Sequence, residues 1–228
     1  MVLDTTFRSA RADRPVAVTE PLAALRFAGA AFLALGGVFV TVTMLAASMA
    51  PAYDFNRAAI SDLGVIPETA ALFNGALVVI GLLNATGGYL VYRAGAPVWL
   101  VPIFGLAGVG AIGAGLVPLD RGGAHSLFAL LAFVLVNVEA IAVARVLQGP
   151  MRWLAVAAGL TGLIYTGVMI AGDAGNPAVF GAIGHGGSER MIAYPVMLWL
   201  IALGGYLLAS PGLAVRSRDS ARDAAAGH

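Results

Sequence analysis

The sequence predicts an all-α membrane protein: a bundle of six transmembrane helices with both termini in the cytoplasm. Three observations lead to this prediction. The chain of 228 residues is 60% hydrophobic and only 11% charged, it contains six long apolar stretches, and its arginines gather on one side of them. Soluble domains carry roughly 25% charged residues. This composition therefore excludes an ordinary soluble enzyme, a nucleic-acid-binding protein and a disordered chain.

Each predicted span is long enough to cross a bilayer as a helix. About 20 mostly apolar residues are needed, because the hydrocarbon offers no water to satisfy backbone polar groups. Proline and glycine separate the stretches and stop the helices. The six predicted spans are Leu22–Ala47, Thr69–Tyr92, Val98–Val117, His125–Leu147, Met151–Ala171 and Glu189–Ser210. They form one domain over residues 22–210, and the polar tails 1–21 and 211–228 are predicted to be disordered.

The arginines predict the orientation, because short loops rich in positive charge stay in the cytoplasm. An even number of spans places both termini on one side of the membrane. That side carries ten arginines: Arg8, Arg11, Arg14, Arg26, Arg93, Arg145, Arg152, Arg216, Arg218 and Arg222. The other side carries three: Arg57, Arg121 and Arg190. The sequence thus predicts a multi-pass protein of the inner (plasma) membrane with cytoplasmic termini.

Some kinds of chemistry are excluded by residues that the sequence lacks. It has no cysteine, which excludes disulfides, thiolate metal sites and cysteine nucleophiles, and its 13 basic residues are all arginine, which excludes a lysine Schiff base. Two histidines with nearby carboxylates could bind zinc or manganese. No two of these residues have the spacing of metal ligands on one helix. The sequence therefore does not decide whether the protein binds a metal or another cofactor.

Reactive side chains gather in the three loops predicted to face away from the cytoplasm. Neighbouring helices lie about 10 Å apart, so these loops are expected to meet over one polar mouth. Carboxylates and histidine there suit acid–base catalysis, and arginine suits an anionic head group. The predicted catalytic residues are Asp62, Asp120, His125 and Glu189, and the predicted substrate-binding residues are Ser61, Arg190, His185 and Trp199.

A structural interpretation competes with the active-site hypothesis at each of these positions. Acidic and hydroxyl residues at helix starts are ordinary capping residues, and Ser188 is a candidate N-cap for the last span. Asp62, Glu189 and Arg190 could instead form an ion-pair clasp that ties helix ends together. Both interpretations stay open at the level of sequence.

Glu139 is the one acidic residue well inside a predicted span. An ionisable residue within the membrane is expected to be paired or functional. Arg93 and Arg145, near the ends of their helices, are the candidate partners. The mid-helix amides Asn84 and Asn137 are expected to make hydrogen bonds between helices.

Three loop motifs resemble those of a known family. They are Ile60-Ser61-Asp62-Leu63-Gly64 at the second span, Pro118-Leu119-Asp120 followed by His125 and Ala129, and Glu189-Arg190 with Tyr194-Pro195 and Trp199. In this order they resemble domain of unknown function 998, a family of small multi-pass membrane proteins. The resemblance implies that Ser61, Asp62, Asp120, His125, Glu189 and Arg190 occupy motif positions, and it brings no established reaction.

Three classes of function follow from these observations. The first is a protein that binds or processes a membrane lipid or isoprenoid-type amphiphile, as a lipid-phosphate hydrolase or transferase or an acid-initiated isoprenoid cyclase. The second is a small transporter or channel that uses Glu139 and the mid-helix asparagines. The third is a structural or sensory membrane protein held by the clasp. The oligomeric state stays open.

Overall fold

The computed structural model describes residues 19–209, which form six α-helices and three short 3-10 helices. In chain order these are α1 (Thr19–Met49), η1 (Ile60–Gly64), α2 (Ala70–Arg93), α3 (Leu100–Leu116), η2 (Leu119–Arg121), α4 (Gly123–Val143), α5 (Gly149–Asp173), η3 (Pro177–Ile183) and α6 (Gly184–Ala209).

The all-α, six-helix prediction is confirmed for this part of the chain. Five of the six helices, all except α3, are long and apolar enough to cross a membrane. The remaining helix, α3, has 17 residues, so it is about 26 Å long at 1.5 Å per residue. That length lies at the lower limit of roughly 17–25 residues for a spanning helix.

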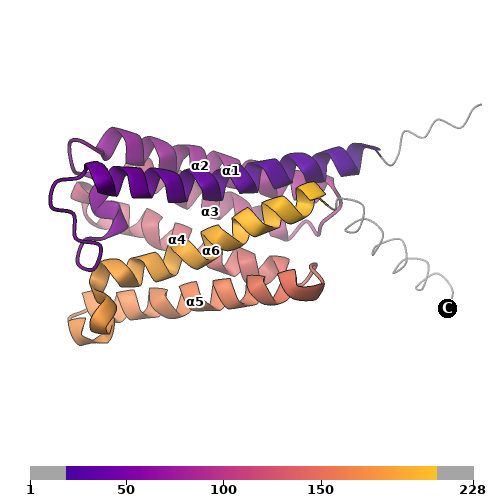
Figure 1. Ribbon diagram of the computed structural model, residues 1–228. Coiled ribbons are helices and arrows are strands. Elements are labelled where there is room, and N and C mark those ends of the chain that lie inside the picture. Colours follow the sequence, from indigo (N-terminus) through magenta and orange to yellow (C-terminus); the bar gives the residue numbers. More distant parts are fainter. Residues whose placement is uncertain (1–18, 210–228) are drawn as a thin grey trace, which may run out of the picture.

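The helices form a closed ring. Each packs against its neighbour in the sequence, and α6 completes the ring by packing against α1. The start of α1 and the end of α6 lie at the same end of the bundle, as Figure 1 shows. We call this the termini end, and we call the opposite end, which carries η1, η2 and η3, the site end.

Paired glycines bring neighbouring helices into close contact. A Cβ atom on Gly81 of α2 would collide with the carbonyl oxygen of Gly108 of α3, and the reverse also holds. Gly29 of α1 and Gly204 of α6 form the same kind of pair. Close backbone approach is how helices pack in a membrane, where lipid leaves little hydrophobic force between them.

A side chain from α4 binds the backbone of α6 in the turn before Pro195. Pro195 has no N–H group, so the helical hydrogen bond to the Met191 carbonyl is missing. The amide nitrogen of Asn137 donates to the adjacent Ile192 carbonyl at 3.1 Å. Gly162 of α5 leaves the space for this amide, because a Cβ atom there would collide with it.

Several boundaries differ from the prediction, and the largest difference is in α6. This helix begins at Gly184, five residues before the predicted start at Glu189. The glycine-rich segment looked like a loop, but Gly186 is helical and packs so closely on the Ala58 carbonyl that a Cβ atom would not fit. Ser188 is therefore not an N-cap, and its hydroxyl donates to the Gly184 carbonyl at 2.9 Å.

The other differences are smaller. The fourth helix ends at Val143 rather than Leu147, and the first begins at Thr19, three residues earlier than predicted. The predicted disordered tails otherwise fall on residues 1–18 and 210–228, which lie outside the described residues.

Candidate functional site

Glu189, on α6, anchors the start of η1. Its side chain is buried, and its two carboxylate oxygens accept hydrogen bonds from the Ile60 backbone N–H and from the Ser61 hydroxyl, the latter at 2.9 Å. These bonds join residues nearly 130 positions apart in the sequence. A carboxylate at the N-terminal turn of a helix suits its unsatisfied N–H groups.

Asp62 holds the same turn from within. One of its carboxylate oxygens accepts a hydrogen bond from the Ala59 backbone N–H at 2.8 Å, as a capping residue does. The Asp62 side chain also lines the larger of the two cavities described below. The Asp62 side chain therefore both caps the first turn of η1 and borders this cavity.

Arg190 binds mainly the loop before η1, and its buried Nε has no hydrogen-bond partner among residues 19–209. One guanidinium nitrogen donates to the carbonyls of Phe55, Ala58 and Gly186 at 2.7–3.1 Å, and the other donates to the Tyr53 hydroxyl at 2.7 Å. The guanidinium also lies over the Phe55 ring, 4.8 Å from its centre. Burial raises the pKa of Tyr53 to about 12, so its neutral hydroxyl donates onward to the Ala59 carbonyl at 2.6 Å.

The predicted ion-pair clasp is therefore wrong in its partners. Among residues 19–209, neither Glu189 nor Arg190 takes part in an ion pair. Both tie helix ends together, but they bind backbone groups and hydroxyls instead of each other. The reason is geometric, since adjacent residues on a helix point about 100° apart.

His125 presents an unused nitrogen to the interior. Its Nδ1 lies 2.7 Å from the Val117 carbonyl, which can only accept, so Nδ1 carries the proton. In the neutral imidazole the other ring nitrogen, Nε2, is then an acceptor. It is buried and has no hydrogen-bond partner among residues 19–209, so it is free to bind a ligand group.

Two cavities meet at His125. The larger, which we call the vestibule, has a volume of about 490 Å³ and lies at the site end between α4, α5, α6 and η1. The smaller, which we call the chamber, has a volume of about 70 Å³ and lies deeper in the ring. The two cavities share five of their lining residues, which are Ser61, His125, Ala129, Phe133 and Glu189.

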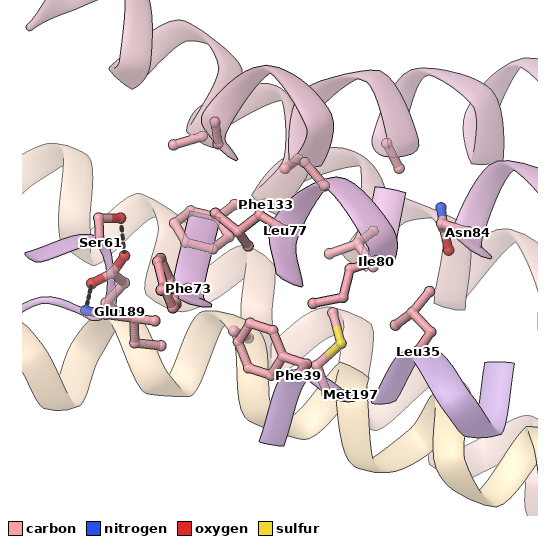
Figure 2. A pocket seen from close by; sticks show the side chains of 18 of the residues that line it. Leu35, Phe39, Ser61, Phe73, Leu77, Ile80, Asn84, Phe133, Glu189 and Met197 are labelled. Carbon is pink, nitrogen blue, oxygen red and sulfur yellow. Dashed lines mark hydrogen bonds between the residues drawn. The ribbon is translucent and has the colours of Figure 1, made fainter. Parts of the chain in front are cut away.

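The two cavities differ in chemistry. The vestibule is bordered by the charged or titratable groups of Asp62, His125, Asp173, His185 and Glu189. The chamber is bordered mainly by aliphatic and aromatic side chains from α1, α2, α3, α4 and α6. Figure 2 shows Ser61 and Glu189 at one end of the chamber, Asn84 at the other, and Phe73, Leu77 and Ile80 among the side chains between them.

His185 stands at the rim of the vestibule with a partner of its own. Its Nε2 lies 3.2 Å from a carboxylate oxygen of Asp173, and both side chains are partly open to solvent. The Phe180 ring packs edge-on against the imidazole, with centroids 5.1 Å apart. Asp173 was not among the predicted site residues. The signal for it was its place in the same predicted outer connection as His185, between the fifth and sixth spans.

The other predicted residues lie elsewhere. Asp120 is exposed on η2 and borders neither cavity. Trp199 is buried halfway along α6, beside α5, and also borders neither. Arg190 borders neither cavity as well. The structure thus brings together Ser61, Asp62, His125, His185 and Glu189 from the predicted set.

Residues 19–209 contain no cluster of three or more histidine, aspartate or glutamate side chains placed to hold a metal ion.

The apolar lining of the chamber was not predicted from the sequence, because an inward-facing Phe73 or Leu77 looks the same in a sequence as a residue that faces lipid. Only the ring arrangement distinguishes the two.

Long apolar helices packed into a closed ring define a multi-pass membrane protein. Its site is an internal cavity with a polar entrance and an apolar interior. The chain belongs to the family described as "Protein of unknown function (DUF998)", which it matches over residues 15–206. The predicted resemblance to this family is thereby confirmed. No match was found among curated proteins or among solved structures.

Proposed function

We propose that this protein binds a single-chain amphiphile, with the polar head group in the vestibule and only the far end of the apolar chain in the chamber, whose volume of about 70 Å³ holds a few carbon atoms. The observation that carries this proposal is that the two cavities share Ser61, His125 and Glu189 while their other linings differ in polarity. A ligand that spans this junction must itself be polar at one end and apolar at the other. Sites for small molecules commonly pair an apolar wall with a few convergent polar groups.

The head group in this proposal is rich in hydrogen-bond donors, such as a hydroxyl or an amine. Three carboxylates and the acceptor Nε2 of His125 border the vestibule, and no arginine does. A phosphate would face like charge there, and Arg190, the predicted phosphate ligand, is used by the loop. An isoprenoid alcohol or amine fits this lining better than a lipid phosphate, and the proposal is one of binding without a chemical step.

In the same proposal the site end faces away from the cytoplasm. The support is the distribution of arginines, since the turns at the termini end contain Arg93 and Arg145 and positive loops stay inside. The ligand would then enter from the outer leaflet, between α4 and α5, whose residues border the vestibule.

The test is photocrosslinking with farnesol that carries a diazirine, followed by mapping of the labelled peptides. We expect labelling of chamber residues such as Phe73 and Met197, and weaker labelling with the matching farnesyl phosphate. Ala129→Trp fills the junction of the two cavities and should abolish the labelling. Leu127→Trp on the same helix is the control, because Leu127 is 66% exposed on the outside of the ring. Equal labelling of the two variants would refute the proposal.

A further inference from the structure

A buried pair of polar side chains lies beside the inner end of the chamber, where Asn84 borders the chamber and Glu139 lies behind it. Asn84 of α2 donates one hydrogen bond to Glu139 of α4 at 2.9 Å and another to the Phe104 carbonyl of α3 at 3.1 Å. Glu139 is 0% exposed and Asn84 is 3% exposed. The other oxygens of this pair, Oε1 of Glu139 and Oδ1 of Asn84, are buried acceptors that receive no hydrogen bond from residues 19–209.

Glu139 has no cationic partner among residues 19–209. The two arginines predicted to pair with it are used elsewhere: Arg93 donates to the Tyr89 hydroxyl at 3.3 Å, and Arg145 lies over the Trp99 ring, 5.9 Å from its centre. That prediction is therefore wrong. An unpaired carboxylate inside a bundle of apolar helices is costly, and a proton removes its charge.

A third cavity lies near the same pair. Asn84 borders the chamber and lies at the opposite end from Ser61 and Glu189, as Figure 2 shows. The third cavity, of about 250 Å³, lies at the termini end and is bordered by Phe32, Phe104 and the turn after α2. Asn84 binds the carbonyl of Phe104, so it borders the chamber and contacts a residue that borders the third cavity.

We propose that Glu139 and Asn84 form a proton-binding site at the centre of the bundle, in which Glu139 carries the proton and the chamber gives access to it. A proton on Oε1 turns one of the unpartnered acceptors into a donor. A metal ion fits less well, because hard cations collect about six oxygen ligands and only two oxygens here are free. This inference needs the chamber but not the amphiphile.

Infrared spectroscopy of the purified protein in lipid tests the protonation of Glu139. We expect a protonated-carboxyl C=O band at neutral pH, its loss in Glu139→Gln, and its retention in Glu68→Gln, since Glu68 is exposed. The buried carboxyl of Glu189 can contribute a band of its own, so the measurement is the difference spectrum, and a C=O region left unchanged by Glu139→Gln would overturn the proposal. Should that variant fail to fold, Asn84→Ala provides a second test, because loss of the hydrogen bond from Asn84 must move the band, and an unmoved band would also overturn it.

The route of access is tested by the rate at which this band shifts after transfer to D₂O. Ala111 of α3 borders the chamber, so Ala111→Phe should slow the shift severalfold. Val109→Phe is the control, because Val109 is 50% exposed on the same helix and lies away from the chamber. Equal exchange rates in the two variants would show that the proton does not pass through the chamber. Failure of the farnesol experiment would leave both results unaffected.

Discussion

Glu189 and Arg190 are neighbours in the sequence, yet they bind different parts of the same connection. Glu189 accepts hydrogen bonds from the first turn of η1, and Arg190 donates to carbonyls of the preceding loop. Together they fix residues 53–61 over the start of α6. Only Glu189 also borders the two cavities, so the two residues are expected to respond differently to substitution.

Replacing Glu189 with leucine should destabilise the protein by about 1–3 kcal/mol, because the Ile60 N–H would be buried without an acceptor. Glu189→Gln keeps one acceptor oxygen and should retain most of the stability. Glu68→Gln, at an exposed position, should leave the stability unchanged. Thermal unfolding in detergent measures all three. A leucine variant as stable as the original protein would show that the anchor of η1 contributes little.

Replacing Arg190 with lysine should cost at least about 1.5 kcal/mol, because an ammonium group cannot reproduce the fork of hydrogen bonds and loses the contact with the Phe55 ring. Arg57→Lys, in the same loop but with an 87% exposed side chain, should change the stability by less than about 0.5 kcal/mol. Labelling by the farnesol probe should survive in both variants. Lost labelling at unchanged thermal stability would instead place Arg190 at the ligand.

Among the elements, η1 shows how a short motif positions the site. Its start is held by Glu189, as described above. Its end is held by Thr69, whose hydroxyl donates to the Leu63 carbonyl at 2.7 Å, and by Asn74, whose amide donates to the Gly64 carbonyl at 2.8 Å. With both ends fixed, Ser61 stays at the junction of the vestibule and the chamber.

The packing of α5 against α4 and α6 leads to a prediction about two glycines. Gly162→Ala should destabilise the bundle by about 1–3 kcal/mol, because the added methyl group collides with the Asn137 amide that supports the turn before Pro195. Gly167→Ala, where a Cβ atom meets nothing within 4 Å, should stabilise the same helix by up to about 1 kcal/mol. Unfolding in detergent compares them, and a neutral Gly162→Ala would mean that the amide can move aside.

At the scale of the whole molecule, the orientation is the property to test. The chain has no native cysteine, so a single introduced cysteine gives labelling without background. Asn176, in the connection from α5 to α6, and Gln148, in the turn between α4 and α5, are both exposed and lie at opposite ends of the bundle. Asn176→Cys should react with an impermeant maleimide in intact cells, and Gln148→Cys only after permeabilisation. The opposite pattern would reverse the orientation.

The site was predictable in part. Ser61, Asp62, His125, His185 and Glu189 were expected near one mouth, and all five border the vestibule. The errors have a common cause. Asp120, Arg190 and Trp199 were assigned from residue type and loop membership, and neither property says where a side chain points. Two of these three lie on the same helix as Glu189 but on different faces of it.

The sequence by itself determined the membrane class, the number of helices and their approximate limits, because apolar length and helix-breaking residues are local properties of the chain. It also identified Glu139 as the one acidic residue well inside a predicted span. Only the tertiary structure decided that Asn84 is its partner, that His125 Nε2 is left unused, and that an apolar chamber opens behind a polar vestibule. These features depend on which faces of distant helices meet around the ring, and hydrophobic helices facing lipid or protein carry nearly the same residues.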